Sequence, residues 1–155
     1  MRSAFSGDEG GAGSPLRRIL LALVLMGIAG LAAELVLLEH VDEWTQWVPF
    51  AALAAGLLSG VAVLLRPGRA TLRVFQWAML AFVIAGAAGV VLHLRGNLEF
   101  EREMDASLTG LALFWRALRG ATPALAPGSL AHLGLIGLAV AYRHPAALSH
   151  TKEKS

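Results

Sequence analysis

Four apolar runs, each near the length a helix needs to cross a bilayer, constrain this fold more than any other sequence feature. They lie at about 18–39, 46–66, 73–94 and 128–143. A hydrocarbon core of ~30 Å requires about 20 residues of helix. Lipid cannot pair with backbone polar groups, so a helix, which pairs its own, is the favoured structure for each run. We therefore predict an all-α, polytopic integral membrane protein built as a four-transmembrane-helix bundle.

Composition agrees with this class and narrows the chemistry. Hydrophobic residues make up 56% of the chain and charged residues 15%, and the mean hydropathy is +0.62. These values are too apolar for an ordinary soluble domain. The formal net charge of +2 is too small to indicate nucleic-acid binding. Cysteine is absent, which excludes disulfides, thiolate metal sites and cysteine nucleophiles.

The distribution of basic residues predicts the orientation. Arg17 and Arg18 precede the first run, and the short connection between the second and third runs is also basic. Basic residues follow the fourth run, whereas the first connection has none. By the positive-inside rule, both termini face the cytoplasm of the inner (plasma) membrane. We predict flexible tails at 1–15 and 146–155 around one membrane domain at 16–145.

The N-terminal part of the first run also resembles a signal peptide. Arg17 and Arg18 precede an apolar stretch, and Gly30-Leu31-Ala32 has the small-x-small pattern of a cleavage site. Apolar residues continue to Leu38 without a polar segment, so an uncleaved membrane anchor explains the pattern better.

Small residues recur at four-residue spacing in two of the runs. The second run carries Ala52, Gly56 and Gly60, and the third carries Ala81, Ala85 and Gly89. Such faces let helix backbones approach closely within a bilayer. The pattern fits packing within one chain, and it also fits a homodimer or contact with a partner membrane subunit.

The segment 105–120 is apolar but too short to cross a bilayer. Leu108, Leu111, Trp115 and Leu118 recur in it at helical spacing. We predict a short amphipathic helix at the membrane interface, between the third and fourth spans, with Asp105 or Ser107 as its N-cap. Pro123 and Pro127 then end it, and Ser129 is the expected N-cap of the fourth span.

Carboxylates and histidines gather at the predicted outer ends of the spans, where they suggest a divalent transition-metal site. Imidazole and carboxylate together suit Zn²⁺, Mn²⁺, Fe²⁺ or Cu²⁺, and helices of a bundle can bring such ligands to one depth. Glu34 lies deepest, and an acid within a membrane segment is a functional hypothesis by default. The first candidate ligands are Glu34, His40, His93 and His132, and the second-rank ligands are Glu39, Asp42, Glu43 and Glu99.

No spacing among these residues is diagnostic of a metal site, so three functions stay open. The first is a membrane protein that binds or handles a divalent metal ion. The second is a non-enzymatic assembly or structural subunit of a membrane complex. The third is a b-type haem protein with His93 and either His40 or His132 as axial ligands. An enzyme is least favoured, because no activated nucleophile or phosphate-binding loop is present.

Overall fold

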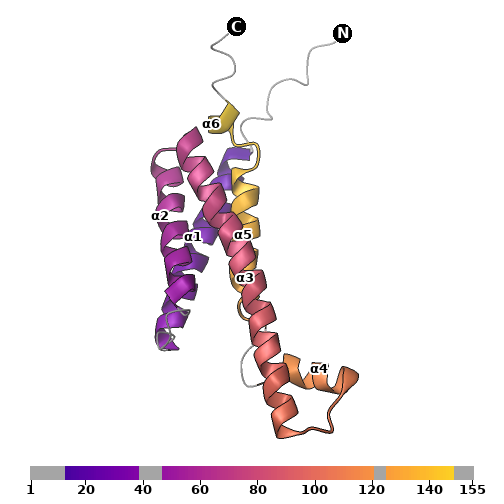
Figure 1. The fold of residues 1–155 in the computed structure, drawn as a ribbon. Helices are drawn as coiled ribbons and strands as arrows, with labels where there is room; N and C mark the ends of the chain where they lie inside the picture. Colours follow the sequence, from indigo (N-terminus) through magenta and orange to yellow (C-terminus); the bar gives the residue numbers. More distant parts are fainter. Residues whose placement is uncertain (1–12, 39–46, 121–124, 149–155) are drawn as a thin grey trace, which may run out of the picture.

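The computed structural model describes residues 13–38, 47–120 and 125–148, and within these ranges the chain is entirely helical apart from turns (Figure 1). The prediction of an all-α protein is therefore confirmed for the described residues. The helices are α1 (Gly13–Leu37), α2 (Trp47–Leu65), α3 (Arg69–Met104), α4 (Gly110–Leu118), α5 (Gly128–Ala141) and α6 (Pro145–Leu148).

Three of the described helices are long and apolar enough to cross a membrane. These segments are Pro15–Leu37, Trp47–Leu65 and Arg69–Met104. The predicted fourth span corresponds to α5, which is apolar but has only 14 residues. At 1.5 Å per residue it rises about 21 Å, less than the ~30 Å of a hydrocarbon core. Its end is set at Arg143, whose φ of 45° does not continue a helix.

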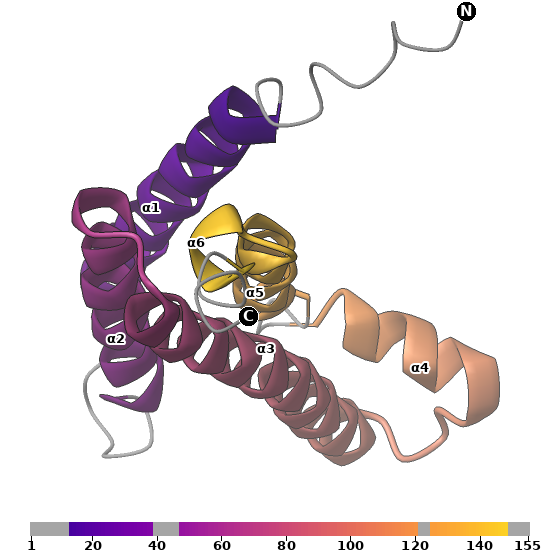
Figure 2. The ribbon, with the colours of Figure 1, turned by 90° about the horizontal axis from the view of Figure 1, so that it is seen from above.

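Four helices contact one another in a closed order. α3 packs against α2 and α5, and α1 packs against the same two helices from the other side. Seen from above, α5 lies between α1 and α3 (Figure 2). The centre of the contacts is apolar, and its most deeply buried side chains are Val24, Ile28, Phe75, Met79 and Phe82.

Glycines bring the backbones of α3 and α5 into direct contact. A Cβ added at Gly86 would lie 2.5 Å from the Ala131 amide nitrogen, and one at Gly134 would lie 2.6 Å from the Met79 carbonyl oxygen. In lipid, where the hydrophobic effect between helices is weak, such close approach supplies van der Waals attraction. Any larger residue at these two positions would therefore clash with the backbone of the neighbouring helix.

The predicted small-residue faces are correct for α2 and partly wrong for α3. Gly56 is buried beneath Phe82, and Gly60 is buried beside Leu25. In α3, however, Ala81 is exposed. The buried face of this helix follows Met79, Phe82 and Gly86, because both α2 and α5 lie on that side.

α3 continues well beyond the third apolar run. The run was predicted to end near residue 94, but the helix extends to Met104, so its last turns project past the other long helices (Figure 1). No proline interrupts residues 95–104, and most of these residues are good helix formers. α4 packs against this projecting end. We call the end of α3 from Arg95 onward, together with α4, the α3–α4 corner.

Candidate functional site

The structure describes half of the predicted metal ligands. Glu39, His40, Asp42 and Glu43 lie outside the described residues. Glu34 is exposed near the end of α1. Glu99 is also exposed, and its Oε1 lies 2.9 Å from Arg95 Nε in an ion pair one helical turn apart.

The two candidate histidine ligands that the structure describes, His93 and His132, lie on helices that run in opposite directions. Gly128, at the start of α5, lies beside Val90 of α3. From there the two helices run antiparallel, so His93 and His132 are carried in opposite directions by about 10 Å in total, at 1.5 Å per residue. His132 is exposed, and its Nδ1 hydrogen-bonds to the Gly128 carbonyl at 2.8 Å. Across the described part of the chain, no three His, Asp or Glu side chains gather closely enough to hold a metal ion.

The best-defined polar arrangement is the α3–α4 corner, which the sequence analysis did not single out. Asn97 is buried, and its Nδ2 donates a hydrogen bond of 2.9 Å to the Ala117 carbonyl. Glu101 is buried as well, with its Oε2 3.0 Å from Arg116 Nε. This ion pair lacks hydrogen-bond geometry at Oε2, so the attraction is electrostatic. Glu101 lies beyond the third apolar run, where an acid is ordinarily exposed to solvent, but here α4 covers it.

A signal for this corner exists in the sequence. Asn97 and Glu101 are four residues apart and therefore share one face if the helix continues past residue 94. The opposing residues on α4 are Leu113 and Ala117, which are also four apart and are both buried. Hydropathy alone ends the third run near Leu94, and only the continuation of α3 to Met104 places Asn97 and Glu101 on one helical face.

The turn that precedes α4 differs from the predicted cap. Asp105 Oδ1 accepts hydrogen bonds from the Ser107 hydroxyl at 2.6 Å and from the Ser107 amide at 3.0 Å. These two bonds lower the pKa of Asp105 below its ordinary value of 3.8. α4 itself begins later, after Thr109, at Gly110 with a φ of 58°. Neither Asp105 nor Ser107 is therefore the N-cap, since the turn takes up both residues.

The outer side of α4 is apolar and has no covering element within the described structure. Leu111, Phe114 and Trp115 are 79%, 41% and 55% exposed, and Leu118 is partly buried. Their spacing of i, i+3, i+4 and i+7 defines one stripe of a helix. The Arg119 guanidinium carbon lies 5.3 Å from the centre of the Trp115 ring, at the edge of this stripe. The predicted amphipathic character of this segment is thus present in a helix of nine residues.

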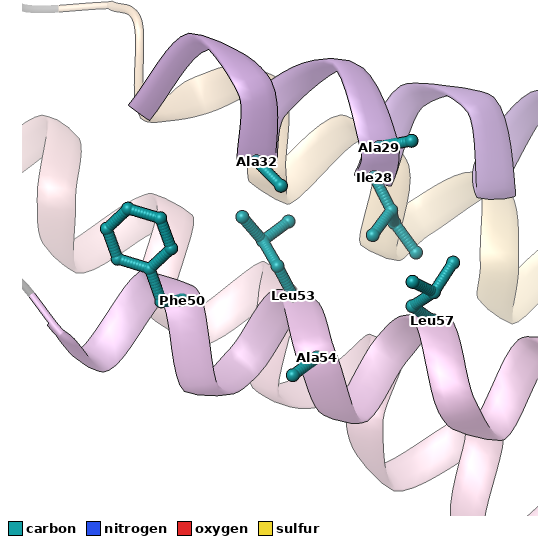
Figure 3. Close-up of a pocket in the computed structure, with 7 residues that line it drawn as sticks. All are labelled: Ile28, Ala29, Ala32, Phe50, Leu53, Ala54 and Leu57. Carbon is teal, nitrogen blue, oxygen red and sulfur yellow. The ribbon is translucent and has the colours of Figure 1, made fainter. Parts of the chain in front are cut away.

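A groove of about 240 Å³ lies between α1 and α2, lined by residues of both helices (Figure 3). Small side chains on both helices leave this space. All of the side chains that line it are apolar, so it offers no group for catalysis or for metal binding. They are Ile28, Ala29, Ala32, Phe50, Leu53, Ala54 and Leu57.

At the opposite end of the molecule, an arginine from α1 caps the last carbonyls of α5. Arg17 Nη1 donates to the carbonyl oxygens of Val140 at 2.9 Å and Tyr142 at 2.6 Å. Beside it, His144 Nδ1 accepts a hydrogen bond of 3.2 Å from the Ala146 amide. Burial, with a smaller contribution from the Arg17 charge, lowers the pKa of His144 below 6.5. Both effects favour the neutral imidazole, whose Nδ1 accepts the hydrogen bond from Ala146.

The geometry defines a class, a small all-α protein with several helices suited to a membrane. Comparison of this chain with protein-family models, with curated proteins and with solved structures found no match.

Proposed function

We propose that this chain is a multi-pass protein of the inner (plasma) membrane, with α1, α2, α3 and α5 as its four spans and both termini in the cytoplasm. Three helices have the length for this role. α5 is short, but it packs between α1 and α3 and ends beside the start of α1, which supports a fourth crossing. α4 is then the interfacial helix on the outer side.

Labelling tests this topology. Cysteines introduced at Asp42 and Glu103 should react with a membrane-impermeant maleimide added outside intact cells, and the natural chain supplies no competing cysteine. A cysteine at Arg69, the first residue of α3, is the matched control on the opposite side and should react only after lysis. Reaction of Arg69→Cys in intact cells, or protection of Glu103→Cys, would reverse the orientation.

Within this topology, we propose a non-enzymatic assembly subunit of a membrane complex. The observation that carries the proposal is the α3–α4 corner. α3 projects beyond its neighbours, and α4 is held against it by Asn97, Glu101 and Arg116, so a small protein maintains a fixed polar structure outside its apolar helices. On the exposed side of the corner, positive and negative side chains alternate over a short distance, and such a pattern suits a specific protein contact. The exposed charged residues that α3 contributes are Arg95, Glu99, Arg102 and Glu103.

Site-specific photo-crosslinking tests the assembly role. A photoreactive residue at Arg102 should form one discrete adduct in cells, and Glu103→Lys should reduce the yield of that adduct. The control position is Leu58, which is 72% exposed in the apolar part of α2 and should crosslink only to lipid. The absence of any adduct specific to position 102 would refute the proposal.

A divalent-metal site is the second candidate, with His132 as its central ligand. One observation favours it. The bond from His132 Nδ1 to a backbone carbonyl leaves Nε2 directed outward, the arrangement found in most metal-binding histidines. The other ligands would come from Glu34 and from residues 39–43. Haem is less favoured, because the divergence of His93 and His132 leaves only His93 with His40 as an axial pair.

Metal content and melting test this candidate. At a hundredfold excess over its dissociation constant, a bound ion stabilises a protein by about 2.7 kcal/mol, which raises the melting temperature measurably. His132→Ala should abolish that shift, whereas His144→Ala should retain it. Purified protein that contains no stoichiometric metal, and that melts identically with Zn²⁺ and with chelator, would exclude the site.

A further inference from the structure

The apolar stripe of α4, formed by Leu111, Phe114, Trp115 and Leu118, is presented by a helix whose position is already set. Its opposite face packs on α3 through Leu113 and Ala117, which are 4% and 0% exposed. The Asn97 amide and the Glu101 carboxylate hold the same face through Ala117 and Arg116. Because these contacts hold α4 in place, the helix does not have to fold when it binds. Its apolar stripe therefore has a fixed position and orientation relative to α3.

That depth corresponds to the edge of the apolar part of α3. The apolar run of α3 ends at Leu94, and α4 contacts α3 at Asn97, three residues or about 5 Å further along the axis. In Figure 1, α4 runs across the direction of α3 rather than along it. The headgroup region of a bilayer begins where hydrocarbon ends, so α4 lies at headgroup depth if α3 crosses the membrane.

The charges of α4 suit the same location. No acidic residue occurs in Gly110–Leu118. Glu101 of α3 balances Arg116, whereas Arg119 lies over the Trp115 ring at the border of the stripe. Tryptophan and arginine are amphipathic side chains that place an apolar part in lipid and a polar part among headgroups. The remaining charges of the corner are mixed in sign and belong to α3 and its C-cap: Arg95, Glu99, Arg102, Glu103 and Asp105.

We infer that the α4 stripe is seated in the headgroup region of the bilayer, with the Arg119 guanidinium bound to the phosphate of an anionic phospholipid. This inference rests on the proposed membrane topology and names the lipid contact of α4. Charge complementarity identifies the partner: Arg119 is a cation at the edge of an apolar surface, and an anionic phospholipid offers a negative phosphate beside apolar chains. A second copy of the chain or a partner helix on the same stripe would be the competing outcomes.

Tryptophan quenching in lipid nanodiscs tests the seating. Two variants each retain one tryptophan, Trp115 or Trp77, and the other three are replaced by phenylalanine. Trp77 is 70% exposed within α3 and reports membrane insertion alone. Phosphatidylcholine brominated near the headgroup should quench both residues. If a triple variant does not fold, fluorine NMR of the unsubstituted chain with fluorinated tryptophan reports the environment of Trp115 instead. The Trp115 signal is assigned with Trp115→Phe.

Charge variants test the phosphate contact. Raising the phosphatidylglycerol fraction should shift Trp115 emission to the blue, and Arg119→Gln should weaken this preference for anionic lipid about 5-fold, the effect expected of one basic residue at a membrane surface. Arg102→Gln removes the same charge from α3 and should preserve the preference. Inorganic phosphate added to phosphatidylcholine nanodiscs should leave the emission unchanged.

Each contrary result has a distinct meaning. Quenching of Trp77 without quenching of Trp115 would overturn the inference and leave the membrane topology intact. Failure to quench either residue would overturn the topology as well. An unchanged lipid preference in Arg119→Gln, or a blue shift with inorganic phosphate alone, would remove the proposed lipid phosphate contact.

Discussion

Single glycines decide how closely the helices approach, and their surroundings differ sharply along one helix. In α3, a Cβ at Gly86 would meet backbone atoms of α5, whereas a Cβ at Gly96 would meet nothing within 4 Å. Sequence spacing alone treats these glycines alike. The contrast between them gives a direct test of the packing.

We expect Gly86→Ala to destabilise the protein by about 1–3 kcal/mol, because the backbone of α5 has to move to admit a methyl group. Gly96→Ala should instead stabilise it by up to ~1 kcal/mol, the difference in helix propensity. Thermal melting in detergent, followed by circular dichroism, measures both. Equal melting temperatures for the two variants would contradict the close contact of α3 and α5.

At the scale of elements, α3 and α4 behave as one unit because polar groups are buried between them. Asn97 gives Ala117 a hydrogen bond that water cannot replace in the closed corner, and Gly120 leaves room for the Asn97 side chain. Only two residues of α4, Leu113 and Ala117, are buried. The free energy that holds α4 in place is therefore concentrated in a few contacts.

Asn97→Ala should loosen α4 without unfolding the long helices. Loss of a buried hydrogen bond costs about 1–1.5 kcal/mol, so amide exchange within Gly110–Leu118 should become roughly 10-fold faster. Exchange in α2 should not change. Gln76→Ala, which removes an exposed amide from α3, is the control and should leave α4 protected. Uniformly faster exchange in α2 and α4 would mean that Asn97 supports the whole fold instead.

At the scale of the whole molecule, residues far apart in the chain join the first long helix, α1, to the last apolar helix, α5. Arg17 near the start of α1 bonds to carbonyls at the end of α5, and His144 lies in the connection from α5 to α6. Unpaired carbonyls at a helix end attract cations, which explains why an arginine is placed there.

Arg17→Gln should lower the unfolding free energy by about 1–2 kcal/mol, because charge-assisted bonds to two carbonyls are lost at a partly exposed site. Arg18→Gln removes the same charge from an exposed neighbouring position and should have little effect. Melting of both variants at one pH and one detergent concentration makes the comparison. Equal losses would show that net charge at this end matters rather than the carbonyl cap.

Stability should also fall in mild acid through His144. Its pKa is lowered in the folded protein, so below about pH 6.5 the unfolded chain binds more protons than the folded chain. The contribution of His144 is therefore fully present above pH 6.5 and is lost as the pH falls through the folded pKa. Melting of the natural chain and of His144→Gln from pH 8 to pH 5 should show a smaller decrease for the variant. Parallel curves would exclude His144 as the cause.

Much of the architecture was predictable from the sequence because hydropathy is a local property. The first two apolar runs, at about 18–39 and 46–66, correspond closely to α1 (Gly13–Leu37) and α2 (Trp47–Leu65). The stripe through Leu111, Trp115 and Leu118 also followed from spacing alone. Bilayer thickness and helical periodicity, both independent of the fold, are enough to identify such segments.

Burial of polar and small residues could not be predicted in this way, because it depends on which distant element covers a given face. No local pattern shows that α4 covers Glu101, or that Ala81 and Gly86 point in different directions around α3. The separation of His93 from His132 follows from the antiparallel contact of α3 with α5, which no local pattern contains. The sequence by itself therefore determined where the long apolar helices lie, and only the tertiary structure decided which side chains those helices bring together.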